Sequence, residues 1–186
     1  MDICFYLAGV AGIEPANGGF RVRSLTTWLH PNILINYKTK KMSIEEYWNN
    51  FTKVNKLPKD TKYVEAFKFG FNDKQADELL DLVLQDKKVA TTSPYFKYED
   101  AIKVGDYSIV LDSKEIPRCI IQTTDTKVLH FNEATFDLIK DEGEDEVLDT
   151  WIEGHRIFLK EACKEENEEF KEDMLILFEH FRVVYK

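Results

Sequence analysis

Residues 86–93 read Asp86-Lys87-Lys88-Val89-Ala90-Thr91-Thr92-Ser93, and they join an expected helix to an expected strand. Before them, apolar side chains recur at helical intervals from residue 76 to residue 84, and Asn72 or Asp73 can cap this helix at its start. The lysines therefore lie just past a helix end. The residues after them favour an extended chain, in which alternation alone places Lys88 and Thr91 on opposite sides.

The middle of the chain is expected to be rich in strands. A hairpin pattern runs from Tyr107–Leu111 through a turn at residues 112–115 into a strand at 118–124, and another strand is expected at 127–131. A late helix is expected over residues 147–162, and a last apolar, partly alternating stretch covers residues 174–185. Because strands and helices mix without a regular repeat, the sequence predicts an α+β fold rather than a doubly wound sheet.

Residues 1–41 differ in composition from the rest and hold half of the eight glycines. A secretory signal is not expected, because no basic residue precedes the short apolar run at residues 7–12. Two short peptides can be encoded by the complement of a transfer RNA gene. A coding sequence for Gly12-Ile13-Glu14-Pro15 resembles the complement of the T-arm, and one for Thr26-Thr27-Trp28-Leu29-His30-Pro31 resembles the complement of the acceptor strand running into the D-arm. We expect a translated upstream extension, or alternatively a genuine disordered leader, followed by one domain over residues 42–186.

A folded element is expected to begin at Met42. Ser43 and Glu46 form a capping-box pattern, and the residues that follow place one apolar face on a helix. The whole chain carries a net charge of −9, and residues 42–186 carry about −12 because residues 1–41 contribute five basic and two acidic side chains. This charge disfavours a long RNA footprint, although a local basic patch around Lys87, Lys88 and Lys97 stays open.

The three cysteines, Cys4, Cys119 and Cys163, are an odd number and lack the spacing of metal ligands. We therefore expect neither a disulfide framework nor a zinc site, and a reducing cytoplasm is the simplest setting. Cys119 is expected to fill apolar space within a strand. No apolar run approaches the roughly 18 residues of a membrane span, so a soluble domain with no membrane partner is expected.

Eight strings of the sequence, taken in order from about Met42 to the end, resemble the ASCH domain family. They are Lys-Lys-x-Ala-Thr-x-Ser at 87–93, Gly105 to Asp112, Pro117 to Thr124, Phe131-Asn132-Glu133-Ala134-Thr135, Asp141-Glu142-Gly143-Glu144, Trp151 with His155, Glu172-Asp173-Met174, and Phe181-Arg182-Val183-Val184. The family is similar to PUA domains. The resemblance therefore implies a small, mixed β-barrel flanked by helices.

One branch of this family hydrolyses the acetyl amide of N4-acetylcytidine with a lysine, a threonine and a glutamate, the lysine lying in a Gly-x-Lys-Thr-x-Thr pattern. Matched residue by residue, the resemblance implies that Lys88, Thr91 and Glu144 are catalytic, with Glu142 as the alternative to Glu144. It implies neither a cofactor nor a metal. The chain departs from the pattern twice, because position 86 is aspartate instead of glycine and position 89 is valine instead of threonine.

Amide hydrolysis needs a nucleophile or an activated water, a proton shuttle, and stabilisation of the oxyanion. Lys88 is expected to act as a neutral amine, which burial or a nearby cation such as Lys87 favours and a close carboxylate opposes. Thr91 would hold a proton relay or donate to the substrate, and Glu144 would protonate the departing cytidine amine. The residues expected to contact the substrate are Lys87, Ser93, Tyr95 and Glu142.

Each of these residues also has a common structural interpretation. A lysine pair at a helix end is typically solvated, Thr91 is a good strand former, and Glu144 is one carboxylate of an acidic loop. Tyr95, Phe96 and Tyr98 could stack on a base, but packing is the more common role of such a cluster. His155 is expected to be structural, since it shares an apolar helix face with Trp151.

Three functions remain open from the sequence. The first is an amidohydrolase acting on N4-acetylcytidine or a similar small nucleoside amide. The second is an RNA-binding or RNA-cleaving module, in which Lys88 contacts a phosphate and Ser93 assists. The third is a non-catalytic nucleotide-sensing regulator. The acidic net charge favours a small nucleoside-like ligand over a polymer.

Overall fold

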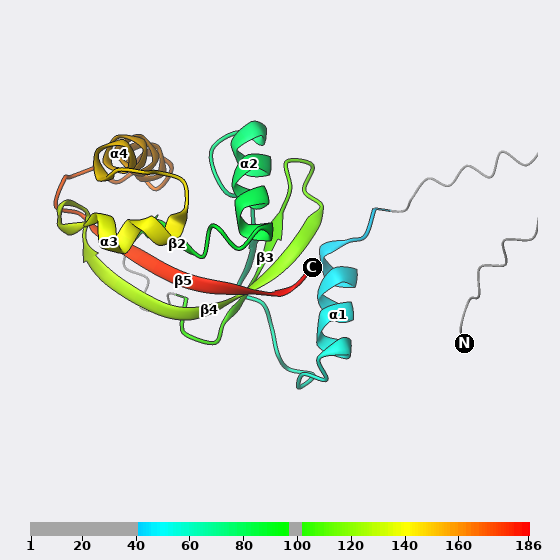
Figure 1. The fold of residues 1–186 in the computed structure, drawn as a ribbon. Coiled ribbons are helices and arrows are strands. Elements are labelled where there is room, and N and C mark those ends of the chain that lie inside the picture. The colour runs from blue at the N-terminus through cyan, green and yellow to red at the C-terminus, as the bar shows by residue number, and fades with distance from the viewer. Residues whose placement is uncertain (1–40, 97–101) are drawn as a thin grey trace, which may run out of the picture. The chain divides into compact units, whose positions relative to one another are not determined.

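A computed structural model of the chain describes residues 41–96 and 102–186. Except for Lys41, the expected extension at residues 1–41 lies outside the described residues, as do Lys97 and Tyr98. The described chain combines helices with one five-stranded sheet (Figure 1), which confirms the expected α+β class. None of its helices is long and apolar enough to cross a membrane.

Two of the described helices begin where the sequence provides caps. The helices are α1 (Ile44–Val54), α2 (Asp73–Leu84), α3 (Phe136–Ile139) and α4 (Leu148–Glu165), with single 3₁₀ turns η1 (Phe131–Glu133) and η2 (Lys140–Glu142). The predicted capping box of Ser43 and Glu46 is present, each side chain bonding the other's backbone N–H. Asn72 caps α2 by accepting from the backbone N–H of Gln75.

The sheet has the strand order β1-β3-β4-β5-β2. The strands are β1 (Glu65–Phe67), β2 (Ala90–Pro94), β3 (Tyr107–Leu111), β4 (Pro117–His130) and β5 (Leu175–Tyr185), and only the β1–β3 pair is parallel. The β3–β4 hairpin is as predicted. The strands expected at 118–124 and 127–131 are present up to His130, but the break expected between them is wrong. β4 runs through both and has a register shift between Thr123 and Asp125.

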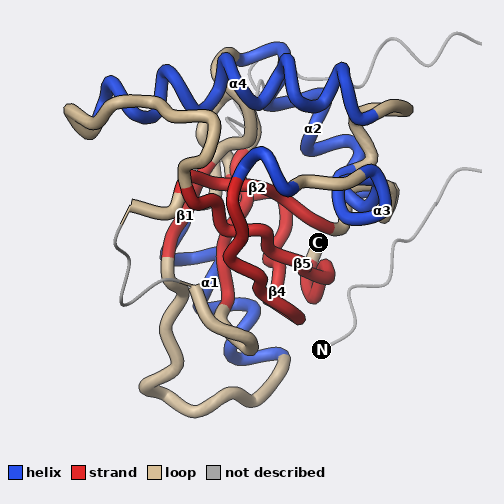
Figure 2. The backbone as a smooth tube through the Cα atoms, turned by 90° about the vertical axis from the view of Figure 1, so that its left-hand side faces the viewer, coloured by secondary structure: helices blue, strands red, loops and turns tan. Residues whose placement is uncertain are grey.

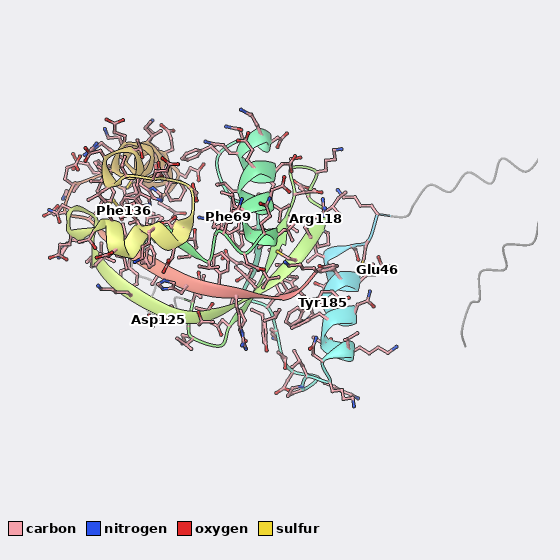
Figure 3. All side chains as sticks on the ribbon, viewed as in Figure 1. Glu46, Phe69, Arg118, Asp125, Phe136 and Tyr185 are labelled. Carbon is pink, nitrogen blue, oxygen red and sulfur yellow. The ribbon has the colours of Figure 1, made fainter. Side chains whose placement is uncertain are left out.

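The helices pack along the length of the long strands β4 and β5. Figure 1 shows α1 at one end of these strands and α3 and α4 at the other, with α2 between them. Tyr185 at the end of β5 packs edge to face on Tyr47 of α1, and Figure 3 shows Tyr185 beside that helix. Trp151 of α4 is fully buried beside Phe131, in the core cluster at the other end.

The middle core cluster lies between α2 and the sheet. Phe69, Leu80 and Val83 pack there against β4 and β5, and Figure 3 shows Phe69 beside α2. Cys119 is fully buried in this cluster, as expected, and burial raises the pKa of its thiol to about 12. The thiol therefore stays protonated and acts as an apolar group.

The sheet is curled rather than flat (Figure 2). Its two edge strands, β1 and β2, are separated by three strands in the sheet, yet residues of both line one cavity. Curling of a twisted sheet brings its edges toward each other in this way. The expected small barrel is thus an open half-barrel, and its cavity holds the predicted lysine.

Candidate active site

The cavity has a volume of about 310 Å³ and opens to solvent. Its walls include both edge strands, the segment 68–71 after β1, parts of α2 and β5, η2 with the chain after it, and the middle of α4. Five carboxyl groups and two lysine ammonium groups lie among the described lining residues. These charged residues are Glu65, Glu142, Glu144, Asp145, Glu179, Lys68 and Lys88.

The end of α2 sets the direction of the two lysines. Asp86 has a φ of 56° and ends the helix in the left-handed conformation, which aspartate tolerates better than most residues. The backbone N–H groups of Lys87 and Lys88 then both donate to the Leu82 carbonyl. As a result Lys87 is exposed, whereas Lys88 is 1% exposed. Asp86, which stands at the glycine of the Gly-x-Lys-Thr-x-Thr pattern, thus adopts a backbone conformation that glycine favours.

The Lys88 ammonium is held by two carboxylates. Its Nζ donates to Glu142 Oε2 at 3.3 Å and makes a short contact with Glu144 Oε1. It also lies 5.2 Å from the ring centroid of Phe69, within the range of a cation–π contact. The sequence left open whether a cation or a carboxylate would accompany this lysine, and the structure places carboxylates there.

Glu142 is the anchor of this cluster. It is 1% exposed, and its Oε1 accepts from Thr92 Oγ1 at 2.7 Å and from Trp151 Nε1 at 2.9 Å. Its Oε2 faces Lys88, and His155 Nε2 lies 3.6 Å away. Burial alone would raise the pKa of Glu142, but His155, Lys88 and Thr92 together lower it below its ordinary value. Glu142 is therefore a fixed carboxylate, and both of its side-chain oxygens have polar partners.

Glu144 differs from Glu142 in its access to solvent. Its side chain is 24% exposed, and its described polar contact is Lys88. It lines the cavity, so it can reach both a bound substrate and the lysine. Of the two glutamates left open by the sequence, the geometry favours Glu144 for proton transfer and Glu142 for holding Lys88 in place.

Gly143 explains why the two glutamates can approach the lysine. Its φ is 70°, and an added Cβ would lie 2.3 Å from the carbonyl oxygen of Lys87. The backbone N–H of Val89 donates to the Asp141 carbonyl at 2.9 Å, which fastens the same segment to the start of β2. Only glycine permits this close approach in the left-handed conformation.

Thr91 and Thr92 differ in what they face. Thr92 Oγ1 bonds Glu142, whereas Thr91 stands opposite Glu179 across the β2–β5 ladder. The alternation expected from the sequence is therefore present. Both threonines and Ser93 line the cavity, which reaches both sides of this edge strand. Alternation along the strand already placed Thr92 on the side of Lys88, but the family resemblance selected Thr91.

Two of the expected substrate contacts are not brought to the cavity. Lys87 is exposed, Tyr95 is partly buried with its backbone N–H donating to the Leu175 carbonyl, and neither is among the described lining residues. Because Lys88 is buried in ion pairs, it adds nothing to a surface basic patch. His155 stacks on Trp151 with ring centroids 4.0 Å apart and also lines the cavity.

Glu179 was missed by the sequence analysis. It is 5% exposed on β5, and its Oε1 accepts from Thr123 Oγ1 at 2.7 Å. Burial, together with the nearby carboxylates of Glu65 and Asp106, raises the pKa of Glu179 to about 7 although the Thr123 hydrogen bond opposes the shift. The available signal was a lone acidic residue inside the apolar stretch 175–181, since such a residue is seldom buried without a reason.

Comparison of this chain with known proteins identifies the family that it matches. The family model of the ASCH domain matches residues 65–185. The crystal structure of an ASCH domain from Lactobacillus crispatus JV V101 is 29% identical, with a TM-score of 0.67 over 76% of this chain and 94% of that one. The crystal structure of a protein from Enterococcus faecalis V583 is 31% identical, with a TM-score of 0.69 over 76% of this chain and 88% of that one. No curated protein matches the sequence.

Proposed function

The chain belongs to the ASCH domain family, whose PUA-like fold it shares, and we propose that it is a metal-independent amidohydrolase removing the acetyl group from N4-acetylcytidine or a related small nucleoside amide. One observation carries the proposal. The wall of a nucleoside-sized cavity holds a buried lysine whose ammonium contacts a partly exposed glutamate, and such a pair can stabilise an oxyanion and move a proton.

The contacts favour a different role for Lys88 from that of the neutral amine expected from the sequence. With carboxylates of Glu142 and Glu144 on its Nζ, Lys88 is placed as a hydrogen-bond donor. It would donate to the acetyl oxygen as negative charge develops there. This is electrostatic stabilisation of the transition state by a preorganised group.

Glu144 would act as the general base and then as the general acid. It takes a proton from water, whose oxygen forms a bond to the acetyl carbon, and it returns that proton to N4 as the carbon–nitrogen bond breaks. The products are cytidine and acetic acid, which releases its proton to solvent as acetate, and no proton is gained or lost by the enzyme. Thr91, at the cavity wall, would hold the water or the substrate through its hydroxyl.

The size and charge of the cavity support a small, uncharged ligand. A volume of about 310 Å³ is near the lower end of the range for small-molecule sites. Its lining has more carboxyl than ammonium groups, so a phosphate would meet net repulsion there. A nucleoside is therefore a better match to this cavity than a nucleotide or an RNA strand.

The test is turnover of N4-acetylcytidine by the full chain, with acetate and cytidine identified by mass. Glu144→Gln should lower kcat by about a hundredfold or more with an unchanged melting temperature, because it removes the proton carrier and keeps the shape. Glu146→Gln is the matched control at an exposed neighbour and should behave like the parent. Lys88→Met should lose as much activity as Glu144→Gln, and the exposed Lys87→Met should not.

Two outcomes would contradict this function. Full activity in Glu144→Gln would remove the proposed base and acid. Absence of product from a panel of acetylated nucleosides, together with cleavage of a short single-stranded RNA, would move the assignment to an RNA-cleaving module.

A further inference from the structure

The cavity contains a second group of carboxyls besides the two that hold Lys88. Glu179 on β5 and Glu65 on β1 both line it, and within the described residues neither forms a salt bridge. Glu179 is buried, and while Thr123 donates to its Oε1, no described residue donates to its Oε2. An acidic side chain that is buried against a cavity with one oxygen unmatched has spare capacity for a ligand.

The position of Glu179 relative to the catalytic wall follows from the strand register. Glu179 pairs with Thr91 across the antiparallel β5–β2 ladder. Residues paired in this way carry their side chains on the same face of the sheet, within about 5.5 Å at Cβ. Glu179 therefore stands beside the threonine that the proposed mechanism places on the substrate.

The surroundings of Glu179 favour its neutral form near neutral pH. Burial, with the negative charges of Glu65 and Asp106, raises the pKa of Glu179 to about 7. A neutral carboxylic acid presents one O–H donor beside one carbonyl acceptor. A carboxylate presents acceptors only, so the two forms recognise different partners.

We propose that Glu179 is the residue that reads the base, donating from its acid O–H to ring nitrogen N3 and accepting from N4–H of an N4-acylated cytosine. This assignment rests on the proposed function and names the substrate class within it. The N3 lone pair and the N4–H lie side by side on that base, so they match a neutral acid. An N2-acylated guanine presents two N–H donors on the corresponding edge and would need a carboxylate instead.

A pH effect at this site has to be separated from other groups that titrate in the cavity. Glu65 and Asp106 are the charged neighbours of Glu179, and Lys88 and His155 line the same cavity. The variant Glu179→Gln resolves this, because a pH effect that comes from Glu179 disappears in it, whereas one that comes from another group persists.

Calorimetric binding of cytidine by the full chain tests the assignment without requiring turnover. The affinity of the parent should be constant below about pH 6 and should fall toward tenfold per unit above pH 7, because only the acid form binds. Glu179→Gln keeps one donor and one acceptor, so it should bind cytidine with no such fall. Glu179→Leu should bind about tenfold more weakly than the parent at pH 6, since both hydrogen bonds are lost.

A ligand change provides a check that does not depend on the leucine variant folding. 3-Deazacytidine has a C–H in place of N3, so the parent and Glu179→Gln should each bind it about tenfold more weakly than cytidine. Equal affinity of the parent for cytidine and 3-deazacytidine would overturn the assignment, as would a parent affinity that does not change with pH. A parent that binds cytidine as expected but releases no acetate from N4-acetylcytidine would overturn the amidohydrolase function alone.

Discussion

At the scale of single residues, Glu142 and Lys88 depend on each other. A buried carboxylate and a buried ammonium each carry a desolvation cost, which is offset here by the Thr92 and Trp151 hydrogen bonds as well as by the ion pair. Removing one partner of such a pair leaves the other charge buried and uncompensated. The stability of the fold and the placement of the lysine are therefore linked at this position.

Glu142→Gln should destabilise the protein at neutral pH by about 2 to 4 kcal/mol, because the amide keeps the shape and removes the charge that faces Lys88. The pKa of Glu142 is lowered in the folded protein, so its stabilising effect is complete above its ordinary pKa of 4.5 and is lost as pH falls through the folded value. Melting temperatures measured from neutral to acidic pH should therefore fall less steeply for Glu142→Gln below pH 4.5 than for the parent.

The exposed Glu146→Gln is the control for this series and should follow the parent curve. Identical curves for the parent and Glu142→Gln would show that the ion pair adds nothing to stability.

At the scale of elements, the segment from η2 to the start of α4 is placed by two backbone contacts. Gly143 lies against the Lys87 carbonyl, and Val89 donates to Asp141, so η2 and the start of β2 are fixed together. The two glutamates on either side of Gly143 then reach a lysine more than 50 residues earlier in the chain. The site is thus built where the segment between α2 and β2 meets the segment from η2 to α4.

Gly143→Ala should cost about 3 kcal/mol or more and should also reduce activity, because the segment must move away from Lys87. Gly105→Ala is a matched control, since Gly105 has a φ of 99° but nothing within 4 Å of an added Cβ. It should cost only about 1 to 2 kcal/mol of backbone strain and leave kcat unchanged. Chemical denaturation and turnover, measured on both variants, separate backbone strain from displacement of the segment around Gly143. Equal losses of stability and activity in the two variants would contradict the importance of the contact between Gly143 and the Lys87 carbonyl.

At the scale of the whole molecule, the curl of the sheet and the net charge act together. The curl brings β1 and β2, the two sheet edges, to one cavity, and it thereby gathers acidic residues from distant parts of the chain. The chain as a whole carries −9. Both features act against binding of a polyanion. Proteins bind nucleic acid backbones favourably when their basic side chains displace the counterions of the phosphates.

Binding of cytidine should therefore change by less than about twofold between roughly 50 and 200 mM salt, since a nucleoside has no phosphate. Short single-stranded RNA should bind more weakly than about 1 μM at physiological salt. Titrations of both ligands at two salt concentrations check this expectation. Submicromolar RNA affinity with a steep salt dependence would instead indicate the RNA-binding module.

The local elements could be read from the sequence because their signals are local. The cap at Ser43, the helix before the lysines, the β3–β4 hairpin and the helix through Trp151 follow from periodicity and capping within a few residues. The strand β1 was missed because its three residues are too short for a pattern. The interruption in β4 was misjudged because neighbouring strands, and not its own sequence, keep that strand continuous.

The sequence by itself determined the α+β class, most of the helices and strands, and the position of Lys88 just after a helix. The tertiary structure decided which groups surround that lysine, because Glu142 and Glu144 are 54 and 56 residues away and reach it only through the fold. It also decided that Thr92 holds Glu142, and that Glu179 is buried with acidic neighbours from distant parts of the chain. Periodicity reports which side of a segment is apolar, whereas ion pairing and burial of charge depend on contacts between segments that periodicity does not record.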